Sequence, residues 1–444
     1  MIVPHKLPRS VPLLTGLLAA LWCTCAAAQT RVVFPLQEDT AVVGGLRHVE
    51  ARHEDTLIDV ARRHRVGFQA IRLANPELNT WIPGEGARVL LPLLFVLPDT
   101  PKRGIVINLP EMRLYHFHAA PSGEGRRVAT YPVSIGRREW GTPQGTLEVI
   151  QKREDPTWTP PDSVRQAYAA QGKSLPDVVP AGPDNPLGAY ALRLSRPTYL
   201  IHGTNWSTGI GLRSTHGCIR MDNDDIGVLF PHVDVGTPVH IVHQAVKAGW
   251  RDGVLYLEVH PPLEERATES SPLETAMERV MAAVAGREAR VDWNRVRATV
   301  TQASGVPRAV GWTAGHAAAP LLATPAAPKS PDAAGEGAGQ PPSGDSLSPV
   351  SLIPVPAGEQ AQDWFVRMGR FRDEERALVL SAHLEADGFA SRVVGGARGT
   401  GAWTYHVLLG PAVGREEAVS LAQRARQRTA LEGEVMRWPP PQGR

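Results

Sequence analysis

The chain has 444 residues and a formal net charge of +2, with 47 Lys and Arg against 45 Asp and Glu. This near-neutral balance, without a basic stripe interleaved with aromatic residues, argues against a nucleic-acid partner. The length exceeds what one hydrophobic core usually supports, so we expect two or more domains.

The first segment has the pattern of a secretory signal peptide, which we place at residues 1–28. Basic Lys6 and Arg9 precede an apolar run over 11–22, and three alanines at 26–28 supply the small residues before a cleavage site. The apolar run is shorter than the ~20 residues that a bilayer span needs, which favours cleavage over a membrane anchor. We therefore expect the mature protein in the periplasm of a Gram-negative-type cell.

Residues 46–92 are predicted to form a compact unit with the order β-α-α-β. A short strand over 48–51 is followed by a helix that Asp55 can cap, a second helix over 66–74 and a strand over 88–92.

This unit resembles a LysM module, with Asp55-Thr56-Leu57, Asn75-Pro76 and Pro83-Gly84 at positions that the family pattern favours. The resemblance implies binding to glycans that contain N-acetylglucosamine. A small packing domain without a ligand remains the alternative.

Residues 102–243 are predicted to be a β-rich domain. A strand over 105–109 and its hairpin partner over 113–117 precede a third strand over 128–135, and long helical periodicity is scarce. An all-β sandwich-like domain fits this pattern better than an α/β one. Within it, residues 162–184 form a long insertion, which is either a lid or acceptor-side wall of a site or a plain surface excursion.

Two imidazoles and one thiol lie within a short loop-linked window of this domain. The apolar run 199–201 predicts a strand that ends at His202, and a glycine-containing loop then returns the chain to Cys218. A cysteine nucleophile needs a base within hydrogen-bond reach, and His202 can supply it. Gly217 lets the backbone approach a substrate closely beside the thiol.

The cysteine count supports a chemical role for this thiol. The chain has three cysteines, of which Cys23 and Cys25 lie in the segment expected to be removed. Cys218 would then be the one thiol of the mature chain, and in an oxidising compartment an unpaired cysteine is a liability unless it is buried or used chemically. Its position beside Gly217, two residues after a histidine, favours a nucleophile over a buried structural residue.

The segment His202-Gly203-Thr204-Asn205, followed by Ser-Thr-His-Gly-Cys-Ile-Arg-Met at 214–221, resembles the signature of the YkuD-type L,D-transpeptidases. The likeness runs from about Gly104 to Val242. The family motif in its shorter form has Asn where this chain has Arg220, and Arg stands there in members that resemble the lipoprotein-anchoring enzymes.

The resemblance implies that Cys218 attacks the carbonyl between the third and fourth residues of a peptidoglycan tetrapeptide stem. D-Ala leaves, and an amine resolves the thioester. His202 would be the proton donor and acceptor, with the Gly203 carbonyl orienting its ring. His216 would support the thiolate and the oxyanion and lower the pKa of Cys218, and the N–H of Gly217 would donate to the oxyanion.

The substrate and its partners follow from the same resemblance. Substrate contacts are expected from four residues: Asn205, Ser214, Thr215 and Arg220. No cofactor and no metal are expected. The acceptor amine belongs either to diaminopimelate of another stem or to a lysine of an outer-membrane lipoprotein.

Three rival interpretations of the window remain. Zinc could bind His202, His216 and Cys218, although the paired short-spaced ligands of a structural site are missing. A hydrolase could use the same thioester with water as acceptor, as an L,D-carboxypeptidase or a cross-link-cleaving enzyme. A non-enzymatic peptidoglycan-binding protein would leave the window unused.

Three further segments follow the β-rich domain. A strand over 254–260 and a helix over 272–285 belong to an extension, 244–316, which we expect to pack on the catalytic part. Residues 317–360 lose hydrophobic periodicity and gather Ala, Pro, Gly and Ser, which predicts a disordered linker.

Residues 361–439 contain two β-α-β halves, which predicts a ferredoxin-like sheet. Met368-Gly369-Arg370-Phe371 together with Leu409-Gly410-Pro411 resembles the SPOR family, whose members bind peptidoglycan strands that lack stem peptides. The expected protein is therefore multidomain. It combines a mainly β catalytic domain of the YkuD β-sandwich type, a small α+β LysM-like module and a C-terminal α+β ferredoxin-like SPOR domain.

Overall fold

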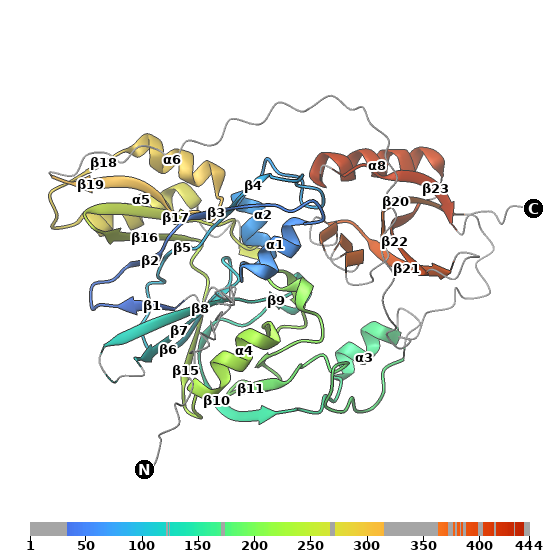
Figure 1. Ribbon diagram of the computed structural model, residues 1–444, viewed down its shortest axis with the longest axis horizontal. Coiled ribbons are helices and arrows are strands. Elements are labelled where there is room, and N and C mark those ends of the chain that lie inside the picture. The colour runs from blue at the N-terminus through green and yellow to red at the C-terminus, as the bar shows by residue number, and fades with distance from the viewer. Residues whose placement is uncertain are drawn as a thin grey trace, which may run out of the picture. The chain divides into compact units, whose positions relative to one another are not determined.

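The fold is described from a computed structural model of the whole chain (Figure 1). It describes residues 33–120, 123, 125–169, 174–266, 271–314, 363–371, 376–377, 380–381, 383–384, 388–397, 403–412, 414–429 and 431–438. The predicted signal peptide, 1–28, and the predicted linker, 317–360, lie outside these residues. Within them, no helix combines the length and apolar character needed to cross a membrane.

A nine-stranded mixed sheet forms the centre of the β-rich region, as the sequence predicted for a mainly β domain. Its strands, in sheet order, are β1 (Val33–Leu36), β8 (Arg126–Pro132), β7 (Arg113–Ala119), β6 (Gly104–Asn108), β15 (Pro238–Val242), β10 (Gly145–Glu154), β11 (Tyr190–Leu194), β12 (Leu200–His202) and β14 (Ile219–Arg220). Two neighbouring pairs are parallel, β6 with β15 and β12 with β14, and the others are antiparallel.

The predicted strand over 128–135 is divided in the structure. β8 ends at Pro132, whose nitrogen has no hydrogen to donate to a ladder. The chain then enters β9 (Ile135–Gly136), which pairs in parallel with β13 (Arg213–Thr215).

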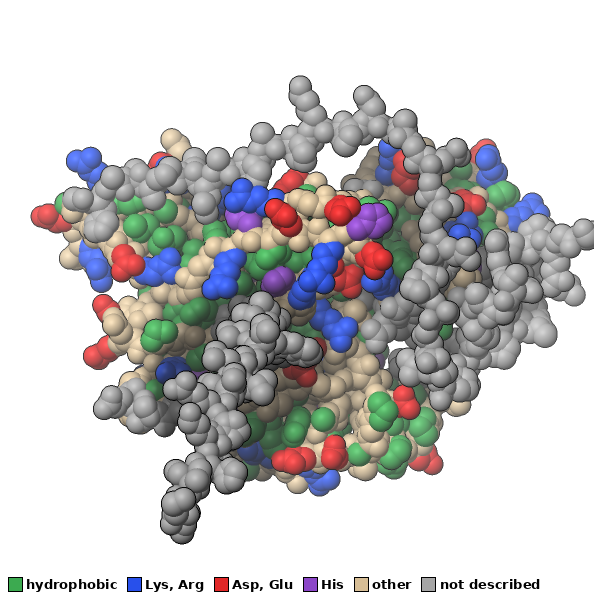
Figure 2. All heavy atoms as spheres, viewed as in Figure 1, with side chains coloured by type: hydrophobic (Ala, Val, Ile, Leu, Met, Phe, Trp, Pro, Cys, Tyr) green, Lys and Arg blue, Asp and Glu red, His purple; other side chains and the backbone are tan. Residues whose placement is uncertain are grey.

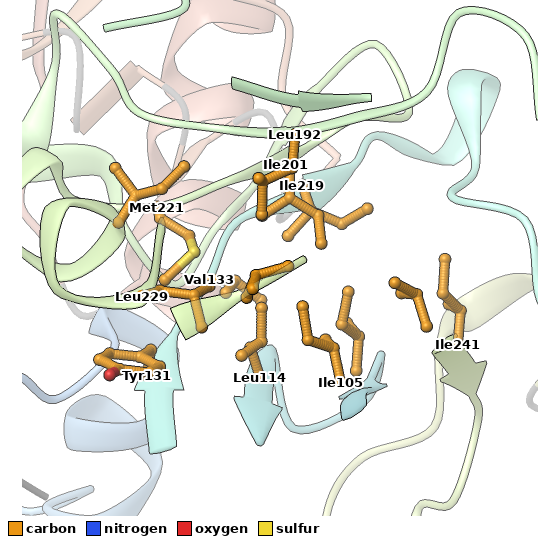
Figure 3. Packing of buried hydrophobic residues seen from close by; sticks show 14 of the residues in the cluster. Ile105, Leu114, Tyr131, Val133, Leu192, Ile201, Ile219, Met221, Leu229 and Ile241 are labelled. Atoms are coloured by element: carbon orange, nitrogen blue, oxygen red, sulfur yellow. The ribbon is translucent and has the colours of Figure 1, made fainter. Parts of the chain in front are cut away.

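Both faces of the central sheet are buried, which explains the continuous apolar runs in its strands. On one face, Ile105 and Ile107 join a core that α4 (Asn223–Leu229) covers with Ile226 and Leu229. Figure 3 shows part of this core, in which Ile105, Leu114, Ile201 and Ile219 come together from four strands. On the opposite face, alternate residues such as Val106 and Tyr115 belong to a second core.

The N-terminal unit covers that second face. It consists of β3 (Arg47–Glu50), α1 (Leu57–Arg63), α2 (Phe68–Ala74) and β4 (Arg88–Leu91), with β3 and β4 antiparallel. The predicted β-α-α-β order is therefore confirmed. Leu57, Val60 and Ile71 of its two helices share one core with the central sheet.

The cap of α1 differs from the prediction. Thr56, not Asp55, is the N-cap, and it forms a capping box with Asp59. The Asp55 carboxylate instead accepts hydrogen bonds from the Arg52 N–H and from Arg63.

The extension after the central sheet forms its own small sheet. Its strands, in order, are β16 (Val246–Arg251), β17 (Val254–Val259), β19 (Arg308–Thr313) and β18 (Ala289–Val291), and α5 (Pro272–Val284) and α6 (Trp293–Gln302) pack on it. A short pair, β2 (Val42–Gly44) and β5 (Leu94–Val96), lies next to β16.

A buried group of charges joins the extension to the central sheet. The Lys247 Nζ lies 2.8 Å from Glu111 Oε2 and 2.9 Å from Glu258 Oε1, and it donates to the Val96 carbonyl at 2.6 Å. Burial alone would raise the pKa of Glu111, but the attraction of Lys247, His260 and Arg113 outweighs it and holds this pKa at about 2. The expected packing of the extension on the catalytic part is thus confirmed.

The C-terminal segment has the predicted ferredoxin-like topology. Its strands are β20 (Asp363–Phe371), β21 (Ser391–Ala397), β22 (Trp403–Ala412) and β23 (Glu434–Trp438), in the sheet order β21-β22-β20-β23. α8 (Arg415–Thr429) buries Ala418 and Ala425 in the core of this sheet.

The described surface carries mixed charges. Figure 2 shows Lys and Arg side chains interspersed with Asp and Glu on one face of the molecule, in keeping with the net charge of +2.

Candidate active site

Two parallel strands bring the histidine and the cysteine of the motif to one face of the sheet. In β12 and β14, Ile201 is opposite Ile219 and His202 is opposite Arg220. Ile201 and Ile219 point into the core, so the alternate residues His202, Arg220 and Cys218 face the other way. All three line a cleft. The structure therefore places His202 and Cys218 in one cleft.

The loop between the two residues is held by the N-terminal unit. The N–H groups of Phe68 and Gln69, in the first turn of α2, donate to the carbonyls of Ile210 (3.0 Å) and Gly211 (3.2 Å). Gly211 has a φ of +89°, and a Cβ there would lie 2.4 Å from the Phe68 nitrogen. Only glycine fits this approach, and it fixes the path of the chain from His202 to Cys218.

His202 is held in one tautomer as a neutral base. Its Nδ1 lies 2.7 Å from the Gly203 carbonyl oxygen, which can only accept, so Nδ1 carries the proton and Nε2 is left as the accepting nitrogen. Burial, followed by the Arg220 guanidinium on the opposite strand, lowers the pKa of His202 to about 3. The predicted contact between His202 and the Gly203 carbonyl is present.

His216 is also neutral, and a residue that the sequence analysis missed controls it. Arg137 Nη2 lies 3.2 Å from His216 Nε2, and a guanidinium only donates, so Nε2 accepts and Nδ1 carries the proton. Trp140 packs on the imidazole with ring centroids 4.0 Å apart. Burial, then Arg137 and Arg220, lower the pKa of His216 to about 4.

The surroundings of Cys218 favour the neutral thiol, contrary to the prediction of a lowered pKa. Its Sγ donates to the Thr198 carbonyl at 3.4 Å. Burial raises the pKa of Cys218, and this effect outweighs the opposing effects of a hydrogen bond from Leu200 and of the Arg220 charge. The prediction took a lowered pKa from the role that the resemblance implies for His216, and it could not include the desolvation of the sulfur.

The turn before the cysteine is braced from within. The Thr215 hydroxyl donates to the Cys218 carbonyl at 2.6 Å and accepts from the Gly217 N–H at 3.2 Å. Thr215 therefore braces the turn, and because it also lines the cleft, its predicted contact with substrate stays a prediction. The Gly217 N–H would have to leave this hydroxyl before it could reach an oxyanion.

Gly217 itself meets a strict steric demand. Its φ is +100°, and a Cβ there would lie 2.8 Å from the Tyr199 ring. Both conditions exclude larger residues from this position.

Asn223 is a second residue that the sequence analysis missed. Its Oδ1 accepts from the Thr204 N–H at 3.1 Å, and its Nδ2 donates to the Thr204 carbonyl at 2.6 Å. The amide thus fixes the segment that follows His202 and Gly203. The sequence offered one signal for Asn223, its position directly after Asp222, which is the N-cap of α4.

Four residues that line the cleft have a buried polar atom without a hydrogen-bond partner among the residues that the structure describes: Ser214 Oγ, Trp206 Nε1, Arg137 Nε and Arg72 Nε. Buried polar atoms are normally satisfied, so these atoms are available to a bound ligand. Arg220 lies over the Trp206 ring, 5.6 Å from its centroid. Asn205, another predicted contact, lines the same cleft and donates to the Asp184 carbonyl at 3.3 Å.

The extension contributes one side of the cleft through the strap 261–266. Arg213 binds Glu265 through two hydrogen bonds of 2.8 and 2.9 Å, and Arg138 lies 3.3 Å from Glu264. Leu263 of the strap packs against the core beneath the site. The strap therefore fixes two segments beside His216, the one that leads into it from Arg213 and the one that contains Arg137 and Arg138.

A hydrogen-bonded loop around Trp158 forms another wall of the cleft. Trp158 exchanges backbone hydrogen bonds of 2.9 and 2.8 Å with Val179. Asn185 Nδ2 donates to the Pro156 carbonyl at 2.7 Å. Pro161, Trp158 and Val164, the last in α3 (Asp162–Ala169), line the cleft. Of the predicted insertion, 162–184, Val164 lines the cleft, and the role of the insertion stays a prediction.

The zinc alternative loses its geometric basis. Across the described ranges, the group of three or more potential ligands with donor atoms within 4.8 Å of one another is Glu111, Glu258 and His260. His202, His216 and Cys218 do not form such a group. The Lys247 ammonium already lies between the two carboxylates of the Glu111 group.

Comparison with known proteins identifies two families in this chain. The L,D-transpeptidase catalytic domain, YkuD, matches residues 102–241, and the SPOR domain matches residues 360–437. The chain is 40% identical to the probable L,D-transpeptidase ErfK/SrfK of Escherichia coli K12 over 286 residues, which are 62% of this chain and 90% of the relative.

One more relative and one solved structure complete the comparison. The probable L,D-transpeptidase YcfS of Escherichia coli K12 is 42% identical over 51% of this chain and 71% of its own. Among solved structures, the catalytic domain of an Enterococcus faecium L,D-transpeptidase is 22% identical over 33% of this chain and its own full length, with a TM-score of 0.24.

Proposed function

The chain belongs to the YkuD family of L,D-transpeptidases, and we propose that Cys218 is the residue that carries the acyl group in this reaction. The substrate is a peptidoglycan tetrapeptide stem. The sulfur attacks the carbonyl of the third residue, and the enzyme transfers that acyl group to an amine.

The acylation step uses the neutral histidine. As a bond forms between the Cys218 sulfur and the carbonyl carbon, the thiol proton passes to Nε2 of His202. The bond to the terminal D-Ala breaks, and its nitrogen takes the proton from the imidazole. A thioester remains on Cys218, and His202 is neutral again.

The second step resolves the thioester. An amine attacks the same carbon and gives its proton to His202, and the sulfur leaves and recovers a proton. We propose that the amine belongs to diaminopimelate of another stem or to a lysine of a lipoprotein. Arg220 and the unpartnered Ser214 Oγ are the groups that we assign to substrate binding.

One observation carries this assignment. The His202 Nδ1 proton is committed to the Gly203 carbonyl at 2.7 Å, which leaves Nε2 as a base on the face of the sheet that also presents Cys218. The Thr198 carbonyl can accept a hydrogen bond from the thiol but is too weak a base to take its proton, so His202 is the group that we assign as base.

The test is to incubate the enzyme with tetrapeptide stems, with and without a peptide that ends in lysine, and to identify the products by mass spectrometry. We expect release of D-Ala and a new amide product. Cys218→Ala and His202→Ala should abolish or strongly reduce both, by roughly 10²–10⁴-fold for the base. His232→Ala, a change at an exposed histidine outside the cleft, is the matched control.

The same experiment separates transfer from hydrolysis. A transpeptidase gives a cross-linked or lysine-linked product, whereas an L,D-carboxypeptidase gives the free tripeptide with release of D-Ala. D-Ala release at the wild-type rate by Cys218→Ala would refute the assignment of the nucleophile.

We extend the proposal to the other parts of the chain. Residues 46–92 would act as a LysM-like module that binds glycans with N-acetylglucosamine, and residues 1–28 would direct the protein to the periplasm. Co-sedimentation with peptidoglycan, with and without stem peptides, tests the glycan binding of the module and of the SPOR domain separately. N-terminal sequencing of the protein from cell fractions tests cleavage and location.

A further inference from the structure

Two arginines lie on the floor of the cleft, on the side of His202 that faces away from Cys218. β10, β11 and β12 are neighbouring strands, in which Arg153 is opposite Ala191 and Ala191 is opposite His202. These three residues form one row across the sheet. Because neighbouring strands lie about 4.8 Å apart, the backbones of Arg153 and His202 are about 10 Å apart.

The adjacent row contains the second arginine. Gln151 is opposite Arg193, and Arg193 is opposite Leu200. Both rows line the cleft, so the two arginines are diagonal neighbours on the face that also carries His202.

These arginines differ from two others that line the cleft, Arg138 and Arg213. Arg138 and Arg213 are each within 3.3 Å of a glutamate of the strap. In contrast, Arg153 and Arg193 are exposed and have no hydrogen bond or ion pair within the residues that the structure describes. Two neighbouring guanidinium groups without an acid repel each other, and a carboxylate between them would remove that repulsion.

We propose that Arg153 and Arg193 form a subsite for a carboxylate on the acceptor, so that the enzyme prefers amines whose own molecule carries a free carboxylate nearby. This inference rests on the proposed function, in which the acceptor amine must give its proton to His202. The row from His202 to Arg153 sets the direction of approach, and the wall that contains Trp158 bounds it. Two acceptors share this chemistry: a diaminopimelate centre with amine and carboxylate on one carbon, and a peptide that ends in lysine.

The test isolates the second half of the reaction. The full-length enzyme is first acylated with a tetrapeptide stem. Its thioester is then mixed with a diaminopimelate stem, with a peptide ending in lysine, or with the carboxamide form of each. The variants are Arg153→Gln, Arg193→Gln and the double change, and Arg290→Gln on the exposed edge of the extension is the control of equal charge.

We expect the double variant to raise the KM for the carboxylate acceptor roughly tenfold to hundredfold, the usual range for loss of a charge-assisted hydrogen bond. The KM for the carboxamide should stay unchanged, as should the rates of D-Ala release and thioester hydrolysis. The acceptor that loses more in the double variant is the one whose carboxylate the subsite binds.

Two results would overturn the proposal. One is an unchanged KM for both carboxylate acceptors in the double variant. The other is slower D-Ala release with normal aminolysis, which would assign the arginines to the donor stem. If the wild-type enzyme releases no D-Ala, the proposed function itself fails, and the acceptor subsite fails with it.

Discussion

The resting enzyme should hold a neutral thiol and a neutral imidazole, not the thiolate-imidazolium pair found in many cysteine enzymes. Burial places the pKa of Cys218 above its usual range, and burial together with Arg220 lowers the pKa of His202 to about 3. Both shifts act against transfer of the proton from sulfur to nitrogen.

The size of the effect follows from these values. An ordinary thiol has a pKa of about 8.5, so transfer of its proton to a group with a pKa of about 3 costs more than about 7 kcal/mol, at about 1.36 kcal/mol per pKa unit. Attraction within the ion pair returns about 4 kcal/mol at an effective dielectric constant of 20 and a separation of about 4 Å. The neutral pair is therefore favoured by about 3 kcal/mol, so that fewer than roughly one enzyme molecule in a hundred holds the ion pair.

The assay is the pH dependence of alkylation by iodoacetamide, followed on the peptide that contains Cys218 by mass spectrometry. Because only the thiolate reacts, the rate should rise about tenfold per pH unit up to at least about pH 8.5 and level off only above it. Arg220→Gln should move the profile to higher pH, since Arg220 lowers the pKa of the thiol. Arg290→Gln should leave it in place.

A rate that is already level between pH 6 and pH 8 would refute this reasoning. It would mean that the thiolate is the resting form and that burial does not control the sulfur. A profile that does not move in Arg220→Gln would remove Arg220 from the account without restoring the ion pair.

Three further predictions concern the structure around the site. Lys247→Met leaves two buried carboxylates without their cation and should lower the free energy of unfolding by about 3–5 kcal/mol. In the wild type, the ionised Glu111 carboxylate stabilises the fold fully at pH values above about 4.3, the pKa of Glu in the unfolded chain. This stabilisation is lost as the pH falls through about 2, the pKa of Glu111 in the folded protein. In the variant the pKa of the Glu111 carboxyl is raised. The difference in free energy of unfolding between wild type and variant, measured by urea denaturation, should therefore be smaller at pH 4 than at pH 7. Gly211→Ala, at a φ of +89°, should cost about 1–3 kcal/mol and reduce turnover. Gly45→Ala, at a position with open space around it, should change neither stability nor turnover. Equal changes in Tm for the two variants would contradict the reasoning. Arg137→Gln should raise the pKa of the imidazole that it contacts above about 4, as read from histidine NMR signals, and an unmoved titration would disprove the contact.

Local patterns predicted much of this fold from sequence. The hairpin of β6 and β7 has apolar runs bounded by Pro110, and its strands pair as expected. The C-terminal β-α-β halves have clear period-2 and helical spacing, and the predicted ferredoxin-like order is present. The closeness of His202 and Cys218 was predictable because the strand and the glycine-containing loop lie next to each other in sequence.

The features that the sequence did not predict depend on contacts between residues that are far apart in the chain. The local sequence around Lys247 does not predict its burial, yet it lies buried between carboxylates from two other segments. Arg137 lies 79 positions from His216, so nothing local marks their contact. The pKa of Cys218 was predicted in the wrong direction because desolvation is a property of the folded surroundings.

The shared core beneath the N-terminal unit constrains which fragments of this protein can fold alone. The segment that the YkuD family model matches, 102–241, leaves out β1, an edge strand of the sheet, and the helices that cover Val106 and Tyr115. A gene fragment cut at those limits would encode a sheet with one apolar face exposed to water. Its loop at residues 210–211 would lack the hydrogen bonds from Phe68 and Gln69. We therefore expect the N-terminal unit and the transpeptidase segment to fold as one unit.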